Sequence, residues 1–279
     1  MPKGLSLHIG LNFVDPNHYQ GWDGQLAACE FDAKDMSALA KKKGFKPTML
    51  IREEASASAV TEAITDAANQ LKVGDMLFVT YSGHGGQVPD KNGDEKDKMD
   101  ETWVLYDRQL IDDELYTLWS RFAPGVRIFV LSDSCHSGSV TKATLYEHLA
   151  AQPLAKDFSD NMTVRTRALP EKVRDATYSQ NKKLYDRIQK TFQSGDKVAV
   201  NASILLISGC QDNQLSSDGA RNGLFTQTLL KTWNKGKYKG RYRKFHQDIG
   251  LKMPPWQSPN FYRAGVRDAR FEAQTPFTV

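Results

Sequence analysis

Two side chains that could carry out nucleophilic chemistry stand at the ends of two apolar runs. One run ends in Tyr81-Ser-Gly-His84-Gly85, and the other ends in Asp133-Ser-Cys135-His-Ser-Gly138. An imidazole next to a thiol can take its proton or pair with the thiolate, which makes the cysteine reactive at neutral pH. The pattern therefore indicates hydrolysis, most naturally of a peptide bond, with Cys135 as nucleophile and His84 as general base and then acid.

This chemistry also needs donors for the oxyanion that develops on the attacked carbonyl. The backbone N–H groups of Gly85 and Cys135 are the natural candidates. His136 is a rival base, but the side chain next to Cys135 on a strand end should point the other way. The alternative interpretation is a buried structural cysteine and a satisfied core histidine.

Elements that alternate along the chain must position these residues. Besides the two runs that end at His84 and Cys135, strands are expected at 5–13, 47–51, 102–106 and 202–208, and helices at 30–43, 56–71, 112–122 and 224–233. Alternating strands and helices predict an α/β fold, with a mostly parallel central sheet covered by helices on both faces. Ligands bind at the carboxyl ends of such strands, where both motifs fall.

The two motifs, in this order and 51 residues apart, resemble those of the metacaspase and orthocaspase branch of the caspase-like cysteine peptidases. The resemblance covers most of residues 5–230. It implies a caspase-like (caspase-hemoglobinase) fold and a monomer. It also implies three portions of one domain: a large catalytic portion at 1–139, a polar insertion or cleavable linker at 140–200, and a small portion at 201–279 that completes the domain.

The resemblance extends to the substrate pocket. In Leu26-Ala-Ala-Cys29-Glu-Phe-Asp32-Ala33, the acid Asp32 matches a pocket residue, Asp133 matches a second acid, and Ser82 matches a polar wall. Asp212 is a plausible further carboxylate. Carboxylates around one slot repel each other unless a cation compensates, and Arg suits best because its planar fork meets them bidentately. We expect cleavage after Arg or Lys. Alternatively, Asp32 is an acid that the helix dipole favours near a helix N-terminus.

An acidic stretch could hold calcium. Residues 90–114 contain ten acidic and four basic side chains, and calcium takes six to eight oxygen ligands. The resemblance carries calcium ligands onto Asp100, Asp112 and Asp113. A fourth acid is expected near Lys142, whose charge would oppose the ion. The alternative is a solvated loop in which Asp112 and Asp113 cap a helix.

The 140–200 segment offers basic residues in a stretch expected to be polar and exposed. It could be cut by the protein itself or by an upstream activating protease, which would make the chain a zymogen. The candidate sites of cleavage are Arg165, Arg167, Lys172, Arg174, Lys182 and Lys183.

Composition, the absence of long apolar stretches and the cysteine content restrict the class of protein further. Hydrophobic and charged contents of 40% and 25% are ordinary for a soluble globular protein. No stretch suits a membrane span or a secretory signal. Cys29, Cys135 and Cys210 cannot all pair, and reduced thiols fit a cytoplasmic protein. Cys29 and Cys210 are expected to be small buried hydrophobes. We expect no organic cofactor.

Other functions stay open on the sequence alone. The chain could be a legumain-like or CHAT-like peptidase with another side-chain preference, or a catalytically idle caspase-like interaction module. The basic and aromatic residues of 231–244 could contact nucleic acid, although such a stretch is more often a solvated helix end and loop. The tail from Lys252 is expected to pack without regular structure.

Overall fold

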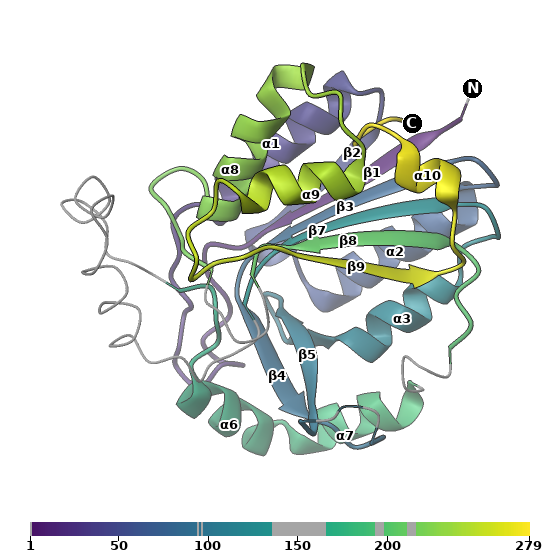
Figure 1. Cartoon of the computed structure of the whole chain (residues 1–279). Coiled ribbons are helices and arrows are strands. Elements are labelled where there is room, and N and C mark those ends of the chain that lie inside the picture. The colour runs from purple at the N-terminus through teal and green to yellow at the C-terminus, as the bar shows by residue number, and fades with distance from the viewer. Residues whose placement is uncertain (1, 94, 96, 136–165, 193–197, 211–215) are drawn as a thin grey trace.

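The computed structural model describes the chain except for residues 1, 94, 96, 136–165, 193–197 and 211–215. A six-stranded sheet in the order β2-β1-β3-β7-β8-β9 forms its centre (Figure 1). β1 (Gly4–Gly10), β2 (Lys46–Ile51), β3 (Met76–Ser82), β7 (Arg127–Asp133) and β8 (Ser203–Ser208) run parallel, and β9 (Asn260–Gly265) pairs antiparallel to β8.

The two strands that lead to the predicted catalytic residues are neighbours. All residues of β3 and β7 are buried, as expected for parallel strands covered on both faces. Their register pairs Ser82 with Asp133 at the carboxyl ends. His84 and Cys135, each two residues further on, therefore leave the sheet at the same edge.

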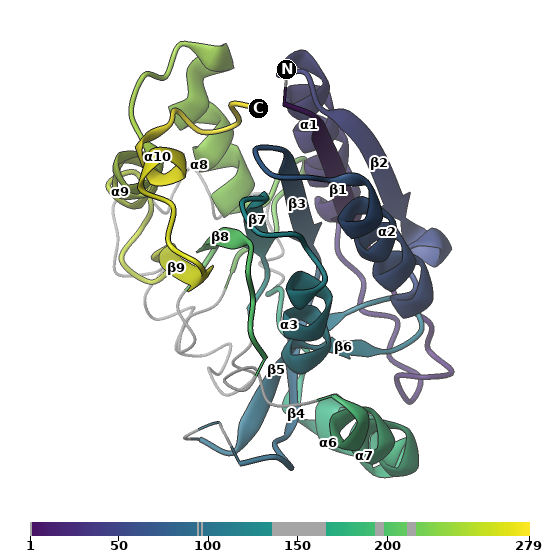
Figure 2. The same ribbon diagram turned by 90° about the vertical axis from the view of Figure 1, so that its right-hand side faces the viewer.

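Helices cover both faces of the sheet, as predicted (Figures 1 and 2). α1 (Cys29–Lys42), α8 (Leu224–Trp233), α9 (Tyr242–Gly250) and α10 (Ala269–Ala273) lie on one face, and α2 (Ala57–Gln70) and α3 (Asp112–Ser120) lie on the other. Side chains of a strand alternate between the faces, so Phe78 packs with the first group of helices and Val79 with the second. The result is two apolar cores separated by the sheet.

A second, smaller sheet begins directly after His84. It consists of the antiparallel strands β4 (Gly85–Pro89), β5 (Met99–Val104) and β6 (Gln109–Ile111). Two further helices, α6 (Glu171–Gln180) and α7 (Lys182–Thr191), lie beneath it in Figure 1. Tyr185 and Ile188 of α7 pack against Val88 and Ile111 of this sheet.

The mostly parallel sheet with helices on both faces is confirmed, but two details of the prediction are wrong. The tail from Lys252 contains β9 and α10, although we expected no regular structure there. The strand expected at 102–106 is β5, which ends at Val104 and belongs to the smaller sheet. In the described part of the chain, no helix combines the length and apolar character needed to cross a bilayer.

Candidate active site

Hydrogen bonds fix both the position and the tautomer of His84. The hydroxyl of Tyr81 donates to the carbonyl oxygen of His84 at 2.6 Å, and the backbone N–H of Val104 donates to the same oxygen at 3.0 Å. The ring atom Nε2 lies 2.8 Å from the carbonyl oxygen of Gly24. A carbonyl can only accept, so Nε2 carries the proton. Nδ1 is buried without a hydrogen-bond partner in the described structure, and its lone pair is the one that could accept a proton.

The environment of His84 keeps its imidazole neutral. Burial lowers the pKa of His84 to about 4, although the carbonyl of Gly24, the carboxylate of Asp218 and the backbone of Ala168 act in the opposite direction. The ring of Trp22 covers it, with ring centroids 4.7 Å apart. At neutral pH the ring is therefore an uncharged base.

A segment of the chain itself lies across the ends of β3 and β7. The backbone N–H groups of Gly85 and Cys135 both donate to the carbonyl oxygen of Arg167, at 2.9 and 3.0 Å. On one side of Arg167, Thr166 forms an antiparallel bridge with Ser217; on the other side, Ala168 forms a parallel bridge with Gly85. The two predicted oxyanion donors thus converge on one carbonyl group.

The thiol of Cys135 is buried and lies next to a second thiol. Its Sγ atom is 2.9 Å from Sγ of Cys210 and accepts a hydrogen bond from the backbone N–H of Ser216. Among the described contacts it has no hydrogen bond to His84. Burial raises the pKa of Cys135, and Cys210 raises it further, so this state holds a neutral thiol.

The guanidinium group of Arg167 fills the predicted acidic pocket. It contacts the carboxylates of Asp32, Asp133 and Asp218 at 2.8, 2.9 and 3.0 Å, and it donates to Oγ of Ser82 at 2.8 Å. The expectation that Arg167 is exposed was wrong, because its exposed fraction is 0%. Burial alone would lower its pKa, but the surrounding carboxylates outweigh burial and raise it. Charge compensation explains why a polar segment enters the interior.

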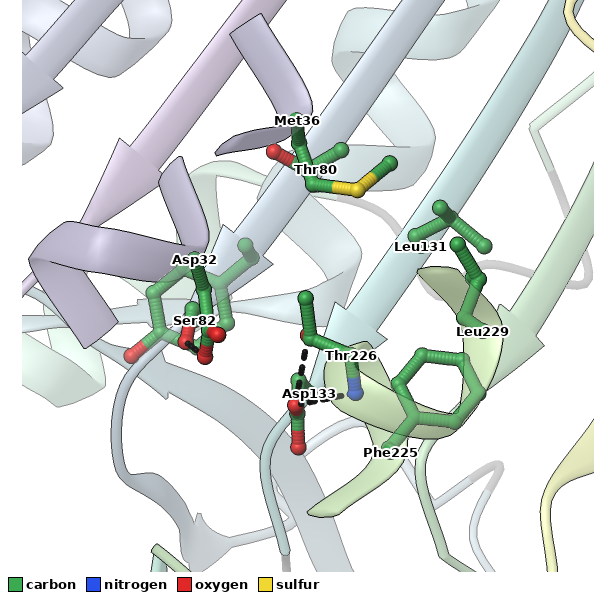
Figure 3. Close-up of a pocket in the computed structure, with 10 residues that line it drawn as sticks. Asp32, Met36, Thr80, Ser82, Leu131, Asp133, Phe225, Thr226 and Leu229 are labelled. Carbon is green, nitrogen blue, oxygen red and sulfur yellow. Dashed lines mark hydrogen bonds between the residues drawn. The ribbon is translucent and has the colours of Figure 1, made fainter. Parts of the chain in front are cut away.

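Two walls of the pocket are built by elements far apart in the sequence (Figure 3). On one wall, Oγ of Ser82 donates to Asp32 of α1 at 2.7 Å. On the other wall, the backbone N–H and Oγ1 of Thr226, in the first turn of α8, donate to Asp133 at 3.2 and 2.8 Å. Burial and Asp133 raise the pKa of Asp32 to about 6, and Arg167 opposes this shift.

Besides Thr226, sequence reasoning missed two residues that contact the guanidinium of Arg167. Asp218 binds Arg167 and also accepts from the backbone N–H groups of Ala27 and Ala28, at 2.7 and 3.3 Å. At Gly223, a Cβ atom would lie 2.5 Å from Nη2 of Arg167, so the guanidinium needs a residue without a side chain there. Asp212, the carboxylate that we expected, lies outside the described residues.

The acidic stretch forms a cluster that differs in part from the predicted one. Carboxylate oxygens of Glu95, Glu101 and Asp112 all lie within 4.8 Å of one another. Burial raises the pKa of Asp112, and Glu101, Asp100 and Asp113 raise it further. The carboxylate of Asp113 accepts from the side-chain amide of Asn92 at 2.6 Å. Lys142 and His136 lie outside the described residues.

Comparison with known families gives one match over most of the chain. The profile described as "Caspase domain" matches residues 13–269. Metacaspase-1 of Kluyveromyces lactis is 29% identical over 254 residues, which cover 80% of this chain and 56% of that protein. Metacaspase-1A of Neurospora crassa is 30% identical over 247 residues, which cover 76% and 51%. The chain therefore spans little more than half the length of these curated relatives.

Solved structures agree with this likeness. A protein from Geobacter sulfurreducens with a crystal structure is 52% identical, with a TM-score of 0.88, over 100% of this chain and 99% of that one. Caspase-1 from Spodoptera frugiperda has a TM-score of 0.53 at 12% identity, over 95% and 86% of the two chains. At that identity, the caspase-1 likeness concerns the fold alone.

Proposed function

The chain belongs to the caspase-domain family, and we propose that it is a cysteine endopeptidase that cleaves peptide bonds after Arg or Lys. In this proposal Cys135 is the nucleophile and His84 the general base. The supporting observation is the way in which Arg167 is bound. Its cationic side chain meets three carboxylates, while its carbonyl oxygen meets two N–H donors. A substrate residue directly before the scissile bond requires this pair of interactions.

The described groups suit each step of acyl transfer. After Sγ of Cys135 rotates toward the carbonyl carbon, Nδ1 of His84 accepts the thiol proton and the sulfur forms a bond to that carbon. The N–H groups of Gly85 and Cys135 then hold the oxyanion. When the C–N bond breaks, His84 returns the proton to the leaving amine, and a water molecule hydrolyses the thioester that remains. The ring of His84 is neutral in the resting state, so the lone pair of Nδ1 is available to accept the thiol proton.

The chain also supplies a substrate of its own. The bond between Arg167 and Ala168 occupies the position of a scissile bond, and the backbone of Ala168, on the leaving side, is near enough to influence the pKa of His84. The uncut segment also covers the site against other substrates. We therefore assign self-processing of a zymogen to this bond. Of the other candidate sites of cleavage, Arg165 lies outside the described residues, and Lys172, Arg174, Lys182 and Lys183 lie on α6 and α7.

Calcium suits the acidic cluster. Burial raises the pKa of Asp112, and repulsion by the neighbouring carboxylates raises it further. A divalent cation would relieve this repulsion by holding oxygens of Glu95, Glu101 and Asp112. The cluster is linked to the active site through the smaller sheet, since Glu101 lies on β5 and this strand pairs with β4, which starts next to His84. Bound calcium would stabilise this sheet and thereby the position of Gly85.

Calcium is expected to raise the melting temperature of the protein, and Glu101→Gln is expected to reduce that shift. At a concentration one hundred times the dissociation constant, binding adds about 2.7 kcal/mol to the free energy of unfolding. Differential scanning fluorimetry with calcium, magnesium or EDTA measures the effect. The matched control is Glu53→Gln, which removes an exposed acid outside the cluster. If calcium raises the melting temperature of both variants equally, Glu101 is not part of a calcium site.

Fluorogenic peptides that end in Arg, Lys or Asp test the proposed activity. With the processed protein, kcat/KM is expected to be highest for Arg and to be lower for Asp by roughly two to four orders of magnitude. This ratio corresponds to the cost of about 3–5 kcal/mol for an uncompensated buried charge. Faster hydrolysis of Asp or Asn peptides would instead favour a caspase-like or legumain-like preference. The absence of hydrolysis of any peptide would favour an idle interaction module.

A further inference from the structure

The thiol beside the proposed nucleophile has no part in the steps above. Cys210 follows β8, which is the neighbour of β7, and the register pairs Ser132 with Ser208. Continuation of this register brings Cys210 beside the residues that end in Cys135. The two sulfur atoms are 2.9 Å apart, and Sγ of Cys210 also donates to the carbonyl oxygen of Ser134 at 3.2 Å. Both cysteines are free and buried.

From this contact we propose that Cys210 is a resolving thiol, which converts an oxidised Cys135 into a reversible disulfide and so switches the peptidase off. The effect on catalysis rests on the proposed function, but the chemistry of the pair does not. The two sulfur atoms are 2.9 Å apart, and a disulfide bond needs a separation of about 2.05 Å.

The oxidant is a peroxide, and the reaction balances with one equivalent of it. The sulfur of Cys135 attacks one peroxide oxygen, so that an S–O bond forms, the O–O bond breaks and the first water leaves. The sulfur of Cys210 then displaces the hydroxyl group of the sulfenic acid, which forms the S–S bond and releases the second water. A dithiol reductant restores both thiols by exchange. Without a resolving thiol, further peroxide drives Cys135 to the sulfinic acid, which reductants do not reverse.

The segment around Arg167 controls access to this pair. While its carbonyl group is bound by the N–H of Cys135, the thiol is buried and neutral, and the thiolate is the form that reacts with peroxide. Oxidation is therefore expected to be slow in the uncut protein and faster once the segment has left the site. Cys29 is also buried and has no described contact with either sulfur, so it is the unpaired third thiol.

The test compares processed wild type, Cys210→Ala and Cys29→Ala after treatment with hydrogen peroxide. Thiols that remain are alkylated, and intact mass and peptide mapping are read alongside hydrolysis of an Arg peptide. Wild type and Cys29→Ala are expected to lose two hydrogens, to show a peptide cross-linked through Cys135 and Cys210, and to regain activity with dithiothreitol. Cys210→Ala is expected to carry a sulfinic acid at Cys135 and to stay inactive.

The proposal is overturned if wild type shows no such cross-link, or if Cys135 is over-oxidised equally in wild type and Cys210→Ala. If Cys210→Ala does not fold, the comparison is repeated with Cys210→Ser, which keeps a small polar side chain at this position. The mass readout needs no peptidase activity. A cross-link in a protein without activity would therefore count against the proposed function alone, and full activity without a cross-link would count against the switch alone.

Discussion

Purified wild type is expected to break into fragments of residues 1–167 and 168–279 on a denaturing gel, whereas Cys135→Ala stays a single chain of 279 residues. The bond after Arg167 already lies at the two oxyanion donors, and only the thiol is missing from the variant. Because the bond lies in the site of its own molecule, the rate should not depend on protein concentration. Intact mass spectrometry over a series of dilutions measures both results.

Three further variants separate the chemistry of this bond from effects on folding. Arg167→Gln is expected to remain uncut, Arg167→Lys to be cut, and Arg174→Gln, which removes an arginine of α6 outside the pocket, to behave as wild type. Cys135→Ala mixed with wild type should stay largely uncut, since its own Arg167 remains bound. Fragments from Cys135→Ala alone would show that another protease makes the cut.

Asp32→Asn is expected to lower kcat/KM for an Arg peptide by roughly two to four orders of magnitude. Removal of one partner from a buried ion pair costs about 3–5 kcal/mol, and Asp32 contacts the bound guanidinium at 2.8 Å. The control is Asp35→Asn on the same helix. Asp35 pairs with the exposed Arg221 at 3.2 Å, and such pairs contribute about 0.2–1 kcal/mol. Equal effects of the two substitutions would rule out a specific pocket acid.

The same residue sets an expected pH dependence. Burial and Asp133 raise the pKa of Asp32 to about 6, so protonation removes one pocket charge as the pH falls through this value, and kcat/KM for Arg substrates falls with it. An open pocket lacks the cation that lowers this pKa, so the transition should not move to lower pH. His84 stays neutral down to about pH 4. The limb near pH 6 should therefore be absent from the profile of Asp32→Asn.

The sheet was predictable because its strands carry strong local signals. β3 and β7 are continuous apolar runs that end in turn-forming residues, and this pattern identifies buried parallel strands without knowledge of their partners. Their ends then bring His84 and Cys135 to one edge. β9 lacked such a signal, because it is an edge strand with exposed residues such as Tyr262 and Arg263. Its polar composition hid the alternation.

The occupant of the pocket could not be read from local pattern. A single arginine in a polar stretch is normally solvated, and Arg167 is buried only because three carboxylates from distant segments surround it. Asp218 was missed for a related reason. It lies in a loop without periodicity, six residues after the Asp212 that we had favoured, and only tertiary contacts with Ala27 and Ala28 identify it.

The strand pairing across the cut determines what processing can release. The proposed break lies in no strand: β7 belongs to the N-terminal fragment, and its parallel partner β8 belongs to the C-terminal one. Tyr185 and Ile188 of α7 also hold the start of the second fragment against the smaller sheet. Nicked protein should therefore elute from a sizing column as one particle of undiminished mass. Cleavage makes Arg167 a chain end, and a lag before full turnover would report the departure of its side chain from the pocket.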